Sequence, residues 1–267
     1  MSTEKAPLHA RSVQHDFAWK LRLTHPDRAE IRVEWHGRPV VFDPVQVQPG
    51  DLVVLTSAAP DRIRGTAAAV ASGARPDVIA DQAILDWLRK QGGVGPDSAP
   101  GGEVSGVRFD AVAYTAPAPV RAGTHFLKAS IGALRPRITL AALAESARIA
   151  PVEGVKPRAW QLTFPAGRLV HLDLALTRAT PPAWLQAAQV LHGADWLIVG
   201  CAYGESEAVA AQIGVFGAGQ VLVTELVNGE RRARGLPTEG VTLLRDRLHA
   251  AKIPAHVFAT QASYRFE

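Results

Sequence analysis

The stretch that decides the fold is Asp51-Leu-Val-Val-Leu-Thr-Ser-Ala-Ala-Pro-Asp-Arg-Ile-Arg-Gly-Thr66. Its apolar run from Leu52 to Leu55 predicts a buried strand. A tight loop follows, and Pro60 indicates the first turn of a helix, where its missing backbone N–H is not needed. Asp61 beside it favours the positive end of the helix dipole. Because many α/β proteins place their chemistry on a loop between a strand and a helix, we expect the functional site here.

The segments on both sides of this stretch predict a β-rich fold with outer helices. Residues 31–35 alternate apolar and polar, and residues 39–42 form the return strand of a hairpin that ends at Asp43-Pro44. A second hairpin is expected over residues 160–174, followed by helices and apolar strands. Two such halves predict an αββα sandwich, in which two sheets of an α/β protein face each other and helices cover their outer faces.

The chain length is compatible with one large domain or two small ones. We expect a loose leader over residues 1–15 and a single domain over residues 16–267, because no long linker divides the two halves. A segment at about 116–150, rich in proline, glycine and arginine and then helical in its spacing, is expected to be an insertion.

The composition is that of a globular protein, with 47% apolar and 20% charged residues and a net charge of +4. No apolar run reaches the roughly 18 residues of a membrane-spanning helix, and the N-terminal residues lack the apolar centre of a signal peptide. A single cysteine, Cys201, excludes an intramolecular disulfide and cysteine-rich zinc modules. These features predict a cytoplasmic protein without membrane contact.

Two motifs resemble those of a known family. The run Thr56-Ser-Ala-Ala-Pro-Asp-Arg62 resembles the Thr-His-x-His-x-Asp-His loop of the metallo-β-lactamase superfamily. The preceding hairpin resembles the Ile-x-Tyr-x-Gly-x-x-Ile-Leu-Phe-Asp-Pro segment of the branch that includes ascorbate-6-phosphate lactonase. The resemblance covers residues 31–258 as a succession of elements. It implies the four-layer fold of that superfamily and an ancestral zinc site.

The resemblance also implies that the histidines of this site are missing. It carries the three histidines of the loop onto Ser57, Ala59 and Arg62, the loop aspartate onto Asp61, the metal-bridging aspartate onto Asp173, and the final histidine onto Glu225. Zinc takes about four N, S or O donors in tetrahedral geometry. Alanine offers no side-chain donor, and arginine is a permanent cation without a lone pair. Without a metal, the hydrolytic route of the family has no activated water.

The resemblance therefore leads to a structural hypothesis about Arg62. If Asp61, Asp173 and Glu225 converge in one pocket, three carboxylates without a metal repel one another. The guanidinium of Arg62 would then replace zinc as their counter-ion, in a geometry that suits carboxylates. The alternative is that Asp61 only begins the helix and Arg62 is a surface cation. On the first hypothesis the protein has no metal cofactor and binds a small acidic or neutral ligand, or a protein partner.

A second functional class stays open, a metal-dependent hydrolase with a rebuilt site. His171 and Asp173 are two apart on a predicted strand and share a face, so that with Asp61 and Glu225 they could hold zinc, manganese or magnesium. Cys201 and Tyr203 follow another strand and are candidate ligand-binding residues.

The remaining alternatives concern partners. The densest basic segment contains Arg231, Arg232 and Arg234 but no aromatic residue for base stacking, so a solvated loop is favoured over nucleic-acid binding. Assembly into a homo-oligomer is left open.

Overall fold

A computed structural model describes residues 21–24, 30–35, 38–115, 152–224, 240–258 and 263–266. The expected leader, the expected insertion at 116–150 and the basic segment at 231–234 therefore lie outside the described residues. Within the described ranges, no helix is long and apolar enough to cross a membrane.

The first sheet has six strands in the order β13-β1-β2-β3-β4-β5. The strands β1, β2 and β3 are antiparallel, whereas β3, β4 and β5 run parallel to one another. Because β3 and β4 are parallel, Asp43 and Leu55 follow them at the same edge of the sheet. The strands are β1 (Leu21–Thr24), β2 (Ile31–Trp35), β3 (Arg38–Phe42), β4 (Leu52–Val54), β5 (Asp77–Ile79) and β13 (Ser263–Phe266).

The second sheet has seven strands in the order β12-β11-β10-β9-β8-β7-β6. Its first half is an antiparallel meander from β6 to β9, and β9 to β12 are parallel. The strands are β6 (Gly102–Val104), β7 (Val107–Ala113), β8 (Arg158–Phe164), β9 (Gly167–Asp173), β10 (Trp196–Gly200), β11 (Gln220–Thr224) and β12 (Ala255–Phe258).

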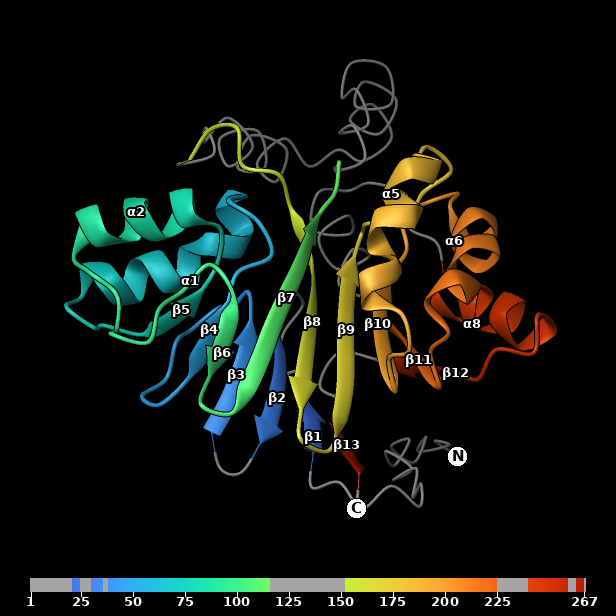
Figure 1. Ribbon diagram of the computed structural model, residues 1–267, viewed down its shortest axis with the longest axis horizontal. Helices are drawn as coiled ribbons and strands as arrows, with labels where there is room; N and C mark the ends of the chain where they lie inside the picture. Colours follow the sequence, from blue (N-terminus) through green and yellow to red (C-terminus); the bar gives the residue numbers. More distant parts are fainter. Residues whose placement is uncertain are drawn as a thin grey trace, which may run out of the picture.

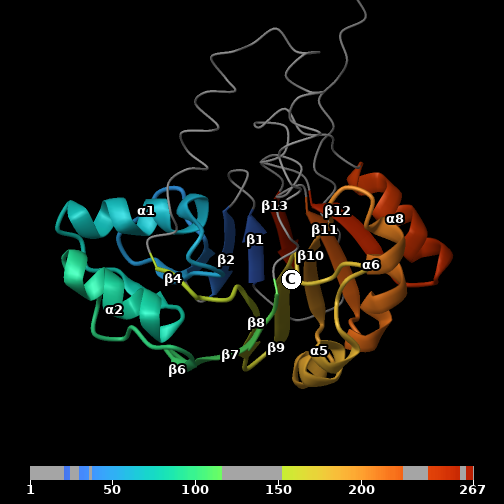
Figure 2. The same ribbon diagram turned by 90° about the horizontal axis from the view of Figure 1, so that it is seen from above.

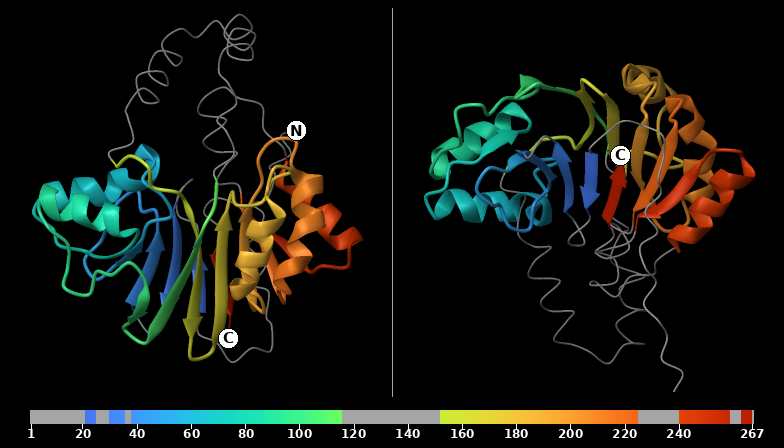
Figure 3. Two further views of the ribbon diagram at one scale, coloured as in Figure 1. Left: turned by 45° about the horizontal axis from the view of Figure 1, so that its top comes forward. Right: turned by 90° about the horizontal axis from the view of Figure 1, so that it is seen from below.

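Helices cover the outer faces of both sheets. The helices α1 and α2 lie beside β4 and β5, and α5, α6 and α8 lie on the opposite side beside β10, β11 and β12 (Figure 1, Figure 2). The views of Figure 3 show the same succession of layers from two further directions. The helices are α1 (Pro60–Ala71), α2 (Gln82–Gln91), α5 (Pro182–Ala187), α6 (Ser206–Ile213) and α8 (Val241–Ala250), with 3-10 turns at η1 (Ala188–Leu191) and η2 (Gly214–Phe216).

Three apolar clusters hold these layers together. The central cluster joins the facing sides of the two sheets, with Phe42 from the first sheet and Trp160 from the second both fully buried. A second cluster packs the outer face of the second sheet against α5, α6 and α8. A third packs Val53 and Val78 of the first sheet against α1 and α2. Successive residues of a strand thus point alternately to the central cluster and to an outer cluster, as the period-two pattern predicts. The arrangement of two facing sheets with helices outside confirms the predicted αββα sandwich.

Some elements differ from the sequence-based expectation. The helix α5 ends at Ala187 and continues as the 3-10 turn η1 up to Leu191, a common way to tighten the end of a helix. The helix α6 likewise continues as the 3-10 turn η2, which Gly217 ends with a left-handed φ of 54°. The strand β13 was not predicted, and the helix expected at 138–149 lies outside the described residues.

Asp81 is the N-cap of α2. Its carboxylate accepts a hydrogen bond from the backbone N–H of Ala83 at 2.9 Å and also pairs with Arg158 of β8. We expect Asp81→Ala to lower the free energy of unfolding by about 1–2 kcal/mol, because the first turn of α2 loses its cap. Asp81→Asn keeps the capping oxygen and should cost less than about 1 kcal/mol. Urea unfolding of both variants tests this, and equal losses would show that the charge matters and the cap does not.

Candidate functional site

A buried ionic cluster joins the two sheets where β3, β7 and β9 end. The strand β3 is followed by Asp43, β9 ends at Asp173, and Tyr114 follows β7. Arg62 reaches the same place from the first turn of α1. All four residues are at most 5% exposed, so their polar groups must satisfy one another.

Arg62 is the centre of this cluster. Its Nη1 donates to Oδ2 of Asp43 at 3.2 Å, and its Nη2 donates to Oδ1 of Asp173 at 3.3 Å. The two nitrogens of one guanidinium thus hold two carboxylates from different sheets. Arg62 is only 4% exposed, so the alternative that it is a surface cation is wrong. A buried guanidinium requires such partners, because an unpaired charge in the interior is costly.

Asp43 is tied to the strand-to-helix loop as well as to Arg62. Its Oδ1 accepts from the backbone N–H of Thr56 at 2.8 Å, and its Oδ2 accepts from the Thr56 hydroxyl at 2.6 Å. Burial raises the pKa of Asp43 to about 7, although the charge of Arg62 and the bonds from Thr56 oppose the shift. We therefore expect Asp43 to exchange its proton near neutral pH.

Asp173 is held by Tyr114 from the neighbouring part of its own sheet. The Tyr114 hydroxyl donates to Oδ2 of Asp173 at 3.1 Å. Burial, together with the negative charge of Asp173, raises the pKa of Tyr114 well above its usual range, so the phenol stays protonated and remains a donor. Within the described residues, each oxygen of Asp173 thus accepts one hydrogen bond, from Arg62 or from Tyr114.

Both aspartates adopt left-handed backbone conformations. The φ angles are 45° for Asp43 and 49° for Asp173. This region is sparsely populated by residues other than glycine, although aspartate tolerates it better than most. Each aspartate lies where a strand ends, and the turn it makes aims its carboxylate at Arg62. Backbone strain of this kind gathers at functional sites and is held in place by the surrounding contacts.

Gly65 lets the loop that carries Asp43 lie directly on α1. A Cβ at this position would overlap the carbonyl oxygen of Pro44 and approach that of Val45 to 2.7 Å. Because Gly65 follows Arg62 by one helical turn, the same close approach places Asp43 beside the guanidinium. The glycine is thus a requirement of the cluster, although it lies in a helix, where glycine is disfavoured.

We expect Gly65→Ala to destabilise the protein by about 2–3 kcal/mol, even though alanine favours helices, because backbone atoms must move to admit the methyl group. The matched control is Gly214→Ala, where a Cβ would meet nothing within 4 Å. That variant should change the free energy of unfolding by less than about 1 kcal/mol. Chemical unfolding measures both, and a Gly65→Ala protein as stable as wild type would contradict the close approach.

The remaining predicted residues lie around this cluster in different settings. Asp61 is partly exposed in the first turn of α1 and is not among the hydrogen-bonding partners of Asp43 or Asp173. The Ser57 hydroxyl accepts from the backbone N–H of Ala59, which is the N-cap of α1. Arg62 therefore pairs with Asp173, as expected, and with Asp43 in place of Asp61. The sequence did not single out Asp43 as a site residue.

His171 lies deeper between the sheets. It shares the inner face of β9 with Asp173, as predicted, and its ring stacks on Phe42 of the other sheet with centroids 4.7 Å apart. Cys201 is buried after β10, with its Sγ 3.4 Å from the carbonyl oxygen of Ala202, whereas Tyr203 is exposed. Glu225, Arg231, Arg232 and Arg234 lie outside the described residues, so their predicted roles stay predictions.

Comparison with known proteins identifies the fold. No protein-family model and no curated protein matches the chain. Among solved structures, it is similar to the metallo hydrolase Igni18 from Ignicoccus hospitalis, with a TM-score of 0.60, 13% identity, and coverage of 92% of this chain and 98% of that chain. It is also similar to an isothiocyanate hydrolase from Delia radicum gut bacteria, with a TM-score of 0.56, 14% identity, and coverage of 92% and 99%. Zinc-bound PqqB from Methylobacterium extorquens matches with a TM-score of 0.52, 10% identity, and coverage of 88% and 86%. The chain therefore has the metallo-β-lactamase fold.

The residues gathered at this end of the sandwich do not fit the zinc that this fold implies. Zinc needs about four lone-pair donors. Arg62 has none, and its N–H groups occupy one oxygen each of Asp43 and Asp173. The other oxygen of Asp43 accepts from the backbone N–H of Thr56, and the other oxygen of Asp173 accepts from the Tyr114 hydroxyl. In the described ranges, no group of three or more histidine, cysteine or acidic residues is arranged to hold a metal ion.

Proposed function

We propose that this protein is a metallo-β-lactamase-fold pseudoenzyme, in which the buried Arg62 takes the place of the metal and whose role is binding, to a small acidic or neutral ligand or to a protein partner. The observation that carries the proposal is the pair of contacts from Arg62 to Asp43 and Asp173. A permanent cation with two carboxylate partners satisfies the electrostatic requirement that a metal would otherwise meet.

The chemistry of the cluster supports a non-catalytic role. Hydrolysis in this fold depends on a metal-activated water. A guanidinium can orient and neutralise carboxylates, but it cannot lower the pKa of a water molecule by direct coordination, because it has no vacant orbital to accept a lone pair. The cluster instead fixes the relative position of the two sheets and of α1. Such a rigid support suits loops that bind a partner.

Metal content tests this proposal. The protein is dialysed against excess zinc and manganese, desalted and measured by plasma mass spectrometry, with Asp173→Ala treated in parallel. We expect well below one metal per chain in both proteins. A supporting readout is an unfolding temperature that excess zinc and a chelator leave unchanged, because a bound metal would raise it.

The opposite outcome identifies the second candidate, a metal-dependent hydrolase. About one metal per chain, lost in Asp173→Ala, would overturn the pseudoenzyme proposal and favour a site around Asp61, His171, Asp173 and Glu225. The observation behind this candidate is that His171 and Asp173 lie on the same face of β9. Lactone and phosphodiester hydrolysis would then be assayed, with His171→Ala and Glu225→Ala as the variants that should lose activity.

A further inference from the structure

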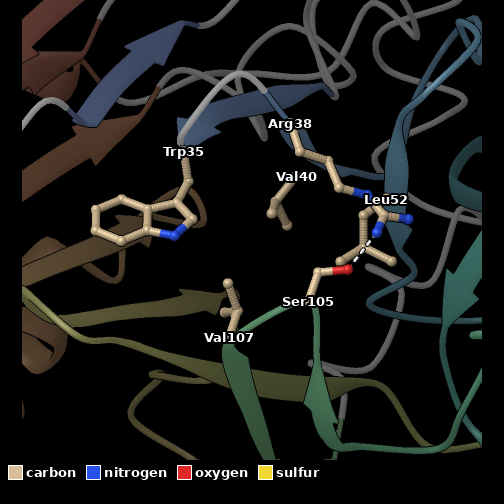
Figure 4. Close-up of a pocket in the computed structure, with 6 residues that line it drawn as sticks. All are labelled: Trp35, Arg38, Val40, Leu52, Ser105 and Val107. Atoms are coloured by element: carbon tan, nitrogen blue, oxygen red, sulfur yellow. Dashed lines mark hydrogen bonds between the residues drawn. The ribbon is translucent and has the colours of Figure 1, made fainter.

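A cavity lies between the sheets at the end opposite the ionic cluster. Its volume is about 180 Å³, and it is lined by Trp35, Arg38, Val40, Leu52, Ser105 and Val107. The first four belong to β2, β3 and β4 of one sheet, and the last two to the β6–β7 hairpin of the other. Figure 4 shows these side chains surrounding an open space. Because β3 and β4 begin here and end at the cluster, the cavity is separated from Arg62 by the length of the sandwich.

The walls of the cavity are apolar and aromatic. Val40, Leu52 and Val107 are buried and belong to the core between the sheets. Trp35 packs against this core and against Phe164, with ring centroids 5.0 Å apart. The contact with Phe164 fixes the Trp35 indole as one wall. A flat apolar molecule would therefore meet an aromatic surface that is already held in place.

One side of the cavity is polar but balanced in charge. Arg38 pairs with Asp77 at 2.7 Å and lies 4.0 Å from Asp97, and its Nη1 donates to the hydroxyl of Ser105. Two carboxylates thus face one guanidinium, so this side does not favour an anionic ligand. It still offers hydrogen-bonding groups, because a serine hydroxyl both donates and accepts and a guanidinium has five N–H donors.

Ser105 has a backbone conformation that is unusual for serine. It has a φ of 54° and precedes Gly106, whose φ is 74°, in the turn between β6 and β7. A two-residue turn with both φ angles positive favours asparagine, aspartate or glycine at its first position. Serine is strained there, and it carries a hydroxyl to the edge of an apolar cavity. The strained backbone of Ser105 at the edge of the cavity therefore suggests a functional role for its hydroxyl group.

We propose that this cavity binds a small uncharged aromatic molecule with a hydroxyl group, of the phenol class. The ring would lie against Trp35 and the aliphatic side chains, and the hydroxyl would reach Ser105 and Arg38. The size is suitable, because an engineered apolar cavity of roughly 150 Å³ binds benzene. This site is independent of the proposed pseudoenzyme role, and it lies away from the strand ends that carry the ionic cluster.

Titration of the full chain with phenol, benzene and cyclohexanol tests the proposal, by calorimetry and by NMR contacts between the ligand ring and Trp35 or Val107. We expect saturable phenol binding with a Kd of about 1 mM or tighter. Benzene should bind about tenfold more weakly because it lacks the hydroxyl, and cyclohexanol should also bind about tenfold more weakly because it cannot stack on Trp35.

The decisive variant is Ser105→Gly, which removes the hydroxyl and relieves the backbone strain, so that it should fold at least as well as wild type. It should bind benzene as before and lose the tenfold preference for phenol. Leu52→Phe, which fills the cavity, should weaken the binding of all three probes, and Ser72→Ala, directly after α1, should change the binding of none. The proposal is overturned if wild type shows no saturable phenol binding, if cyclohexanol binds as tightly as phenol, or if Ser105→Gly keeps the preference.

Discussion

Arg62→Met is expected to lower the free energy of unfolding by about 3–5 kcal/mol, the cost of removing one partner from a buried ion pair. The methionine fills much of the same volume, so the loss is electrostatic rather than a packing defect. Without the guanidinium, Asp173 stays buried without its cationic partner, and Asp43 loses the charge that opposes the rise of its pKa. Urea or guanidinium unfolding at neutral pH measures the effect.

Two further variants isolate the cause. Arg89→Met removes an exposed cation that pairs with Asp86 at 2.9 Å and should cost less than about 1 kcal/mol. The double variant Asp43→Asn with Arg62→Met also removes the buried Asp43 carboxyl, which is unfavourable near neutral pH whether ionised or protonated, so it should be more stable than Arg62→Met alone. An Arg62→Met protein that loses no more than Arg89→Met would contradict the buried cluster.

The stability of the protein is expected to fall as the pH rises from about 4 to about 7, through the titration of Asp43. The ordinary pKa of aspartate is 3.8, and burial raises that of Asp43 to about 7. Between these values the folded protein keeps a proton that the unfolded chain has released, so folding binds protons and a higher pH opposes it. A shift of about three pKa units corresponds to about 4 kcal/mol over this interval, after which the dependence levels off.

The measurement is the free energy of unfolding at several pH values, for wild type and for Asp43→Asn. The difference between the two proteins isolates the contribution of Asp43 from those of other titrating groups. We expect the two stabilities to be similar near pH 4 and wild type to lose about 4 kcal/mol relative to the variant by about pH 7. Parallel curves would show that Asp43 does not titrate in this range.

Much of the fold could be predicted from the sequence because its signals are local. The alternation in Ile31–Trp35 and the apolar run after Asp51 each indicate a strand, and the pattern over residues 160–174 indicates a hairpin; the structure has each of them. The short strand β13 is different, because its four residues become a strand only by pairing with β1. No local pattern contains that information.

The candidate site could be predicted only where one motif carried it. Arg62 and Asp173 were identified through the resemblance, and the structure brings them together. The sequence marks Asp43 only as the end of a hairpin and does not single out Tyr114. Their roles depend on the left-handed turn of Asp43 and on the burial that both share. Both are properties of the assembled sandwich, although the Asp-Pro pair at a strand end is a signal that could have marked Asp43.

The contact between Arg62 and Asp173 spans 111 residues of the chain. Contacts of such long sequence separation carry a large loop-closure entropy and form only after the surrounding structure is in place. The ion pair is therefore expected to be absent from the folding transition state. Its loss in Arg62→Met should raise the rate of unfolding by about 150- to 5,000-fold, the equivalent of the expected 3–5 kcal/mol, and leave the rate of folding nearly unchanged. The guanidinium would thus determine the lifetime of the native state. The rate at which the native state forms would depend on other parts of the chain.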